Sequence, residues 1–394
     1  MAFFDPTRAS YRANPYPSLA RLREEDPVHR SPALQAWVTT RFGDCAELLR
    51  DNTRFTADPT RTEGPRADAI TVHRATVPLG SAATLSNTSA QAHAALRRVV
   101  NPCFTPAAVR KAAPRISSLV EDFLDDLPPG EPFDFMGRFA NPLPKRVMLG
   151  LMGFPEAEAE RMQHCLAVLE VTRSNPRAGN VSAARAAQTE LEASLERRLA
   201  DEQTEGSVLG ALAHAHTGGM SIDTVVSVAA HIATVGSDPA AGAIANSMVA
   251  IAGHPSSVGE LRRVRPRMRM AAHELLRYDS PTHLVPRFAV ADTELGGRRI
   301  RRGDVVLAMV GAANRDPAAF PKPDELNLER DARRQLGFGQ GDHICLGAPL
   351  ALAILEAALG GLLDRFARIE LVAPPDYCAT VELRIPDRLI LRCT

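Results

Sequence analysis

The stretch LGFGQGDHICLG, residues 336–347, places one cysteine, Cys345, near the end of a glycine-rich segment. Its glycines let the backbone turn tightly and approach a flat ligand closely, because glycine has no Cβ to collide with the ligand. The apolar residues 346–352 that follow predict the start of a helix, and the positive end of a helix favours thiolate over thiol. A lone cysteine is nevertheless more often a buried free thiol than an iron ligand. The interpretation therefore depends on the pattern around Cys345.

Six residues of this stretch meet the pattern Phe-Gly-x-Gly-x-His-x-Cys-x-Gly: Phe338, Gly339, Gly341, His343, Cys345 and Gly347. The pattern resembles the haem loop of the cytochrome P450 family, in which a thiolate pushes electron density onto the iron and favours O–O cleavage. The resemblance implies haem b as the cofactor and Cys345 as the axial ligand of its iron. It also implies that Phe338 packs near the sulfur, that Gly339 contacts the cofactor and that His343 hydrogen-bonds a haem propionate.

Composition narrows the class of protein. The 394 residues are 45% hydrophobic and 23% charged, which suits a globular chain with a large core. Acidic and basic residues balance at 46 each, which argues against general nucleic-acid binding. No run of about 18 apolar residues and no signal-peptide pattern is present, so we expect a cytoplasmic protein without a membrane anchor. The six cysteines show no paired spacing typical of zinc or a redox dithiol.

The resemblance covers nearly the whole chain and implies one mainly helical domain, residues 1–394, with the triangular-prism shape and small β-sheets of the family. Apolar periodicity predicts helices over 16–25, 42–52, 106–127, 155–170 and 182–202. Short apolar runs predict a hairpin within 28–40 and strands at 288–290, 305–310, 369–372 and 389–391. Residues 57–85 and the break at 174–180 match the family's lid segments. The nearly chargeless segment 222–253 predicts a helix packed on all sides, which in the family crosses the haem.

Two basic groups are candidates for the haem propionates. His93 and Arg97 lie four residues apart, so both side chains point the same way from one helix. Spacing alone fits a solvated basic face equally well, and the order of motifs in the family supports the haem interpretation. Arg287, at the start of a predicted strand, matches the family's other propionate-binding arginine.

Glu274 and Arg277 lie three apart on a predicted helix, close enough for a charge-assisted pair. In isolation such a pair is usually a solvated surface contact of little energetic value. In the family, a Glu-x-x-Arg pair and a downstream arginine, here Arg330, form a buried structural triad behind the haem loop.

The long helical segment departs from the family at Gly236-Ser237-Asp238-Pro239. Most members place an acid followed by threonine beside the oxygen site, where the pair supports proton delivery. Here the acid is Asp238, but Pro239 takes the threonine position. Proline removes an N–H and clashes with the carbonyl four residues back, at a cost of about 3 kcal/mol in a regular helix, so we expect a local bulge. Gly236 is expected to contact the cofactor.

The resemblance implies an oxidoreductase that takes electrons from a ferredoxin or flavodoxin with its reductase and uses dioxygen to oxidise a hydrophobic small molecule, such as a natural-product intermediate. Two interpretations of Pro239 stay open: an ordered water relays protons from Asp238 in a conventional hydroxylase, or the enzyme favours C–C or C–N coupling, ring closure or desaturation. A peroxide-driven peroxygenase and a non-catalytic haem-based sensor are the alternatives from other classes. Arginines 97, 98, 333 and 334 are expected to steer the electron donor. By family position, the expected substrate contacts are Ala230, Thr234, Val235, Val285 and Leu383.

Overall fold

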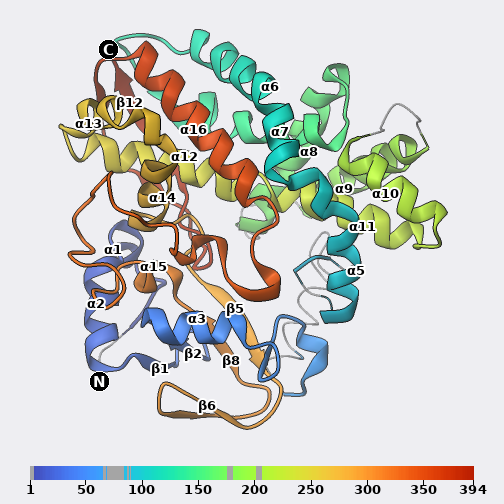
Figure 1. Cartoon of the computed structure of the whole chain (residues 1–394), viewed down its shortest axis with the longest axis vertical. Coiled ribbons are helices and arrows are strands. Elements are labelled where there is room, and N and C mark those ends of the chain that lie inside the picture. Colours follow the sequence, from blue (N-terminus) through green and yellow to red (C-terminus); the bar gives the residue numbers. More distant parts are fainter. Residues whose placement is uncertain are drawn as a thin grey trace.

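The helix that follows Cys345 organises one half of the molecule. It is α16 (Ala348–Arg365), and it lies against α6 (Pro106–Asp125), as Figure 1 shows for the red and cyan helices at the top. Close approach of the two helices requires Gly361, since a Cβ there would lie 2.7 Å from Val120 and 2.8 Å from Leu124. The predicted helix after the cysteine is thus confirmed, although it begins at Ala348.

The computed structural model describes residues 4–64, 68, 84–86, 88, 90–174, 181–200 and 206–394. Its helices are α1 (Ala9–Ala13), α2 (Tyr16–Glu25), α3 (Phe42–Arg50), α5 (Ala90–Val100), α6, α7 (Pro142–Met152), α8 (Glu156–Ser174), α9 (Val181–Leu199), α10 (Val208–Thr217), α11 (Ile222–Val235), α12 (Asp238–Ala252), α13 (Ser257–Arg263), α14 (Met268–Tyr278), α15 (Val310–Ala313) and α16. Its short helical turns are η1 (Pro59–Arg61), η2 (Asn101–Phe104), η3 (Met136–Ala140), η5 (Arg265–Arg267), η6 (Leu336–Phe338) and η7 (Gly341–His343). Its strands are β1 (Val28–Ser31), β2 (Ala36–Thr39), β3 (Phe55–Thr56), β4 (Pro132–Asp134), β5 (Val285–Ala289), β6 (Thr293–Leu295), β7 (Arg298–Ile300), β8 (Val305–Ala308), β9 (Ile369–Leu371), β10 (Asp376–Tyr377), β11 (Pro386–Arg388) and β12 (Ile390–Cys393).

The predicted N-terminal hairpin is confirmed as β1 and β2, but it belongs to a larger sheet. β2 pairs in parallel with β8, which places residues 36–39 beside 305–308 in a five-stranded sheet of order β1-β2-β8-β5-β3. This sheet lies at the blue end of the molecule with α2 and α3, away from α6 and α16 (Figure 1). The predicted strand 305–310 was too long, because the chain turns into α15 at Val310.

The segment predicted as one long helix is two helices. α11 ends at Val235, and α12 begins at Asp238 with Ser237 as its N-cap. Pro239 is therefore the second residue of a new helix, where the missing N–H would have had no intrahelical partner. Instead of a bulge strained by about 3 kcal/mol, the chain accommodates the proline by restarting the helix.

The acid–arginine pair predicted on α14 is buried. The Arg277 Nε and Nη2 atoms donate to Glu274 at 2.6 and 2.9 Å, and both side chains have no exposed surface. Arg330 donates to the same carboxylate at 3.1 Å. Arg277 also donates to the Asn314 carbonyl at 2.9 Å, and the Asn314 side chain accepts the Leu336 N–H at 2.7 Å. The triad is thus joined, through Asn314, to the start of the stretch that carries Cys345.

Most of the predicted lid, residues 65–67 and 69–83, and most of the predicted break, residues 175–180, lie outside the described residues. Within the described part of the chain, we find no helix that combines the length and apolar character needed to span a membrane.

Glu274→Gln is expected to destabilise the protein by roughly 3–5 kcal/mol, because it leaves two arginines beside a neutral amide in a buried site. Urea unfolding monitored by circular dichroism measures the change. Glu356→Gln is the matched control, since Glu356 pairs with the exposed Arg269 and such surface pairs contribute about 0–1 kcal/mol. Equal effects of the two variants would contradict the assigned role of the triad.

Candidate active site

Cys345 lies between η7 and α16 on a loop held by its own backbone. The Cys345 N–H donates to the Phe338 carbonyl at 2.8 Å, which closes the loop. All six cysteines lie in the described part of the chain, and Cys345 alone is exposed. The Phe338 ring lies edge-on to His273, with centroids 6.3 Å apart. The sulfur of this loop is therefore accessible, whereas the other five cysteines are buried in other parts of the protein.

Two glycines of this loop require backbone conformations that other residues rarely adopt. Gly339 and Gly341 have φ values of +69° and +74°. A Cβ at Gly341 would also lie 2.8 Å from the Leu49 carbonyl oxygen of α3. These glycines therefore let the loop turn and let it pack on α3. From the sequence alone, the need for glycine was attributed to tight turns and to the approach of a flat ligand, and the packing on α3 was not predicted.

Burial raises the pKa of the Cys345 thiol. The N–H groups of Gly347 and Ala348 and the charge of Arg97 act in the opposite direction but offset only part of this effect. The sulfur is thus exposed on one side and crowded by protein on the other. The N–H groups at the helix end thus favour the thiolate as expected, although burial outweighs them, and a bound metal ion would deprotonate the thiol directly.

Basic side chains converge beside this sulfur from three separate elements. Arg97 of α5 donates to the Ile344 carbonyl at 3.0 Å. The rings of His93 and His343 have centroids 4.1 Å apart. Burial and the neighbouring charges of His93 and Arg287 lower the pKa of His343 to about 4. The structure therefore brings together His93, Arg97, Arg287 and His343.

Arg287 on β5 is a buried cation without a counter-ion. It is 4% exposed, its Nη1 donates to the Pro286 carbonyl at 2.9 Å, and its Nε has no hydrogen-bond partner. Among the described residues, no carboxylate forms an ion pair with Arg287 or Arg97. Burial without a counter-ion lowers the Arg287 pKa to about 10. A buried guanidinium of this kind indicates an anionic group supplied by a ligand.

The other predicted site residues differ in their burial and in their contacts. Gly236 packs against α7, since a Cβ at this position would lie 2.5 Å from the Met148 side chain. Its predicted contact with the cofactor stays a prediction. Ala230 is fully buried, and its role as a substrate contact stays a prediction. Thr234 donates its hydroxyl to the Ala230 carbonyl at 2.8 Å, and Val235 is 39% exposed. Val285 is half-buried on β5.

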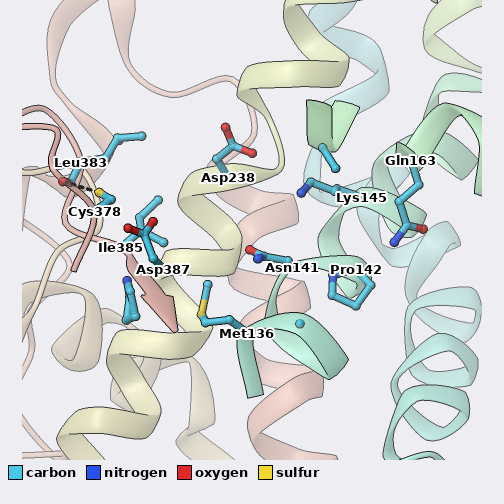
Figure 2. Close-up of a pocket in the computed structure, with 13 residues that line it drawn as sticks. Met136, Asn141, Pro142, Lys145, Gln163, Asp238, Cys378, Leu383, Ile385 and Asp387 are labelled. Atoms are coloured by element: carbon cyan, nitrogen blue, oxygen red, sulfur yellow. Dashed lines mark hydrogen bonds between the residues drawn. The ribbon is translucent and has the colours of Figure 1, made fainter. Parts of the chain in front are cut away.

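Asp238 and Leu383 lie in the wall of a cavity of about 350 Å³. The wall comes from η3, α7, α8, the start of α12 and the C-terminal segment around β11 (Figure 2). It contains none of the residues predicted to hold the cofactor. Leu383 thus lines a cavity, and its role as a substrate contact stays a prediction.

Sequence reasoning missed Lys145 and Asp387 in this wall. Lys145 is 4% exposed and Asp387 is exposed. A signal for Lys145 existed, because the chain contains only three lysines, Lys111, Lys145 and Lys322, among 46 basic residues. Nothing in the sequence indicates that residues 145, 238 and 387 meet.

This fold is that of a helix-rich haem-thiolate protein, and comparison with known proteins agrees. A sequence model described as cytochrome P450 matches residues 249–385. Polyketide biosynthesis cytochrome P450 PksS of Bacillus subtilis (strain 168) is 30% identical over 95% of this chain and 93% of its own length. The crystal structure of CalO2 superposes with a TM-score of 0.89 at 32% identity, covering 100% of this chain and 99% of CalO2. CxnD, a cytochrome P450 enzyme for C–S bond formation in chuangxinmycin biosynthesis, gives a TM-score of 0.85 at 26% identity over 96% and 94% of the chains.

This chain belongs to the cytochrome P450 family and is an oxidoreductase of that type. The family's cofactor is haem b, an iron porphyrin with two anionic propionates. The residues present fit it: one exposed thiol, two guanidinium groups without described carboxylate partners and two histidines lie on the same loop and its neighbours.

Arg287→Met is expected to stabilise the apoprotein, on the order of 1 kcal/mol, because it removes an unpaired buried charge. The same change is expected to weaken haem binding at least tenfold, because the anionic side of the cofactor loses a partner. Urea unfolding of the apoprotein and titration with haem measure the two effects. Arg299→Met, on an exposed arginine paired with Asp292, should change neither quantity, and tighter haem binding by Arg287→Met would contradict the assignment.

Proposed function

We propose that this protein oxidises a hydrophobic small molecule in the assembly of a natural product, with Cys345 as the residue that would bind the haem iron. The observation that carries the proposal is the placement of Cys345. It is the exposed cysteine among the six, it receives two backbone N–H groups, and it lies beside cations that lack described counter-ions.

Haem b, when bound, supplies dioxygen activation, which cysteine thiolate ligation favours. The chain supplies binding and orientation. Arg97, Arg287, His93 and His343 would hold the propionates by charge and hydrogen bonds, which would orient the cofactor relative to Cys345. The Glu274–Arg277–Arg330 triad holds the loop in place through Asn314.

The names of the relatives support a role in natural-product assembly. PksS is named for polyketide biosynthesis, and CxnD for C–S bond formation. The exposed Val235 and the alanine-rich composition of α11 and α12 favour an apolar substrate. Coupling, ring closure or desaturation is the reaction class that we propose for a site with Pro239 in place of an alcohol.

Proton supply in this site begins at Asp238. Asp238 is 3% exposed and is the first residue of α12, in the wall of the cavity described above. Ser237 does not replace the missing threonine, because its hydroxyl donates to the Ala233 carbonyl at 3.3 Å. We therefore assign proton transfer to Asp238 and ordered water.

A ferredoxin or flavodoxin with its reductase is the electron donor that we propose, and we propose the cytoplasm as the location of the reaction. Arg98, Arg333 and Arg334 are exposed on the side of the molecule where α5 and the residues before η6 meet the cysteine loop. Positive charge there would steer an acidic donor.

Cys345→Ala is expected to abolish the red-shifted absorption band of the reduced, carbon monoxide-bound protein, because thiolate ligation is lost. The absorption spectrum measures the change directly. Cys103→Ala, on a buried cysteine, should leave the band in place. A band that survives in Cys345→Ala would refute the proposed ligation.

Pro239→Thr tests the reaction class. If Pro239 affects only the proton relay, the variant forms the same product and loses less peroxide; if the missing alcohol decides the reaction, the product changes from coupled or desaturated to hydroxylated. Product mass spectrometry and peroxide release are measured with a ligand found by its effect on the ferric spin state. Pro239→Ala is the control, since it removes the ring without adding a hydroxyl. Unchanged products and unchanged peroxide release would contradict both interpretations.

Peroxide-driven oxidation is the second candidate function, favoured by the absence of the alcohol at Pro239. Turnover with hydrogen peroxide alone at the rate of the donor-driven reaction would support it.

A further inference from the structure

The cavity behind α12 runs from the surface to a buried acid. Its wall includes the exposed Asp387 and Gly137, the half-buried Gln163, and then Lys145 and Asp238, which are 4% and 3% exposed. Its volume of about 350 Å³ far exceeds the roughly 15 Å³ that one water molecule requires. Polar groups at both ends and this volume make it suitable for a chain of several waters.

Lys145 is the unusual residue in this wall. Of the three lysines in the chain, Lys111 and Lys322 are exposed, and Lys145 alone is buried. It lies in the first turn of α7, and Figure 2 shows its side chain extending towards the α12 side of the cavity, where Asp238 lies. The chain otherwise uses arginine for most of its 46 basic positions.

The difference between lysine and arginine matters at such a position. A guanidinium group does not release its proton in proteins, whereas an amine can donate a proton and then accept another. The ammonium group also has three N–H donors on a flexible stem, so it can reorient between water and a carboxylate. A buried lysine in the same cavity wall as Asp238 therefore suits proton transfer.

We propose that Lys145 relays protons from water in this cavity to Asp238, so that protons reach the reaction through a cavity whose wall contains none of the predicted cofactor contacts. The inference rests on the proposed role of Asp238. Lys145 acts through Asp238, so it is a positioning residue for proton supply. It compensates for the alcohol that is missing at position 239.

The stoichiometry defines the test. Dioxygen reduced by two electrons takes up two protons, and one oxygen atom oxidises the substrate while the other leaves as water. Hydrogen peroxide already carries two electrons and two protons. A defect in proton supply should therefore slow donor-driven oxygen consumption and spare peroxide-driven oxidation.

The first experiment asks whether the cavity exchanges with solvent, and it needs no turnover. Cys378 lies in the cavity wall, whereas Cys45 and Cys393 are fully buried elsewhere. In the resting haem-bound protein, methyl methanethiosulfonate should modify Cys378 at least tenfold faster than Cys45 or Cys393, as measured by peptide mass spectrometry. Equal rates for the three thiols would overturn the proposal.

The second experiment compares Lys145→Met with Lys111→Met, which removes an exposed lysine. A plant ferredoxin and its NADPH reductase serve as donor, and oxygen consumption is followed in H₂O and D₂O. We expect Lys145→Met to lower the rate at least tenfold and to raise the solvent isotope effect at least twofold, with Lys111→Met unchanged. In Lys145→Ala, added methylammonium should restore at least part of the rate, because the cavity admits a small amine.

Peroxide-driven oxidation of a redox dye distinguishes a defect in the proton relay from a defect in the haem site as a whole. If Lys145→Met keeps this activity and the reduced carbon monoxide spectrum while losing donor-driven oxygen consumption, the relay is supported. If donor-driven rates and isotope effects are unchanged, the relay is refuted while the proposed haem ligation stands. If both activities fall together, Lys145 acts on the haem site as a whole and the relay is likewise refuted.

Discussion

A single buried carboxylate, Glu274, fixes the geometry on which the cysteine loop depends. It accepts hydrogen bonds from Arg277, Arg330 and the backbone N–H of Asn327. Because burying this carboxylate without those partners would cost several kcal/mol, its position determines where the two arginines lie. Arg277 then holds the backbone of Asn314, whose side chain caps the N–H of Leu336 at the start of the loop. The sulfur of Cys345 is thus positioned by contacts that begin far from it in the sequence.

The interruption between α11 and α12 shows how a helix-breaking residue becomes part of a site. A proline within a continuous helix would remove one hydrogen bond and strain another. At the second position of α12 it does neither, and the first intrahelical hydrogen bond runs from the Ala241 N–H to the Ser237 carbonyl at 3.0 Å. The restart also makes Asp238 the first residue of α12, where backbone N–H groups favour a carboxylate. Pro239 therefore places the acid as well as removing the alcohol.

The sequence predicted those features that depend on local patterns. Helical periodicity gave α2 and α9 to within a few residues, and the order of glycine, histidine and cysteine indicated the haem loop. Features made by residues distant in the chain were not predictable. The parallel pairing of β2 with β8 joins segments more than 260 residues apart, and the buried pair of Arg384 with Asp279, at 2.8 Å, joins the C-terminal segment to the end of α14. Periodicity also cannot tell which face of an apolar helix meets a cavity and which meets the core, so it gave no indication that Ala230 is fully buried.

The proposed roles in this protein fall into two groups of residues. The cysteine loop and its cations lie apart from the cavity wall that contains Lys145 and Asp387, and Asp238 is the residue that the two groups of assignments share. In the proposed relay, a buried carboxylate between the cavity and the haem would limit the access of bulk water to the reaction, where water competes with productive chemistry. A relay through one buried carboxylate admits protons without admitting the solvent that carries them. A site without the usual alcohol has particular need of such a division, because proton supply then depends on the cavity rather than on a hydroxyl beside the oxygen.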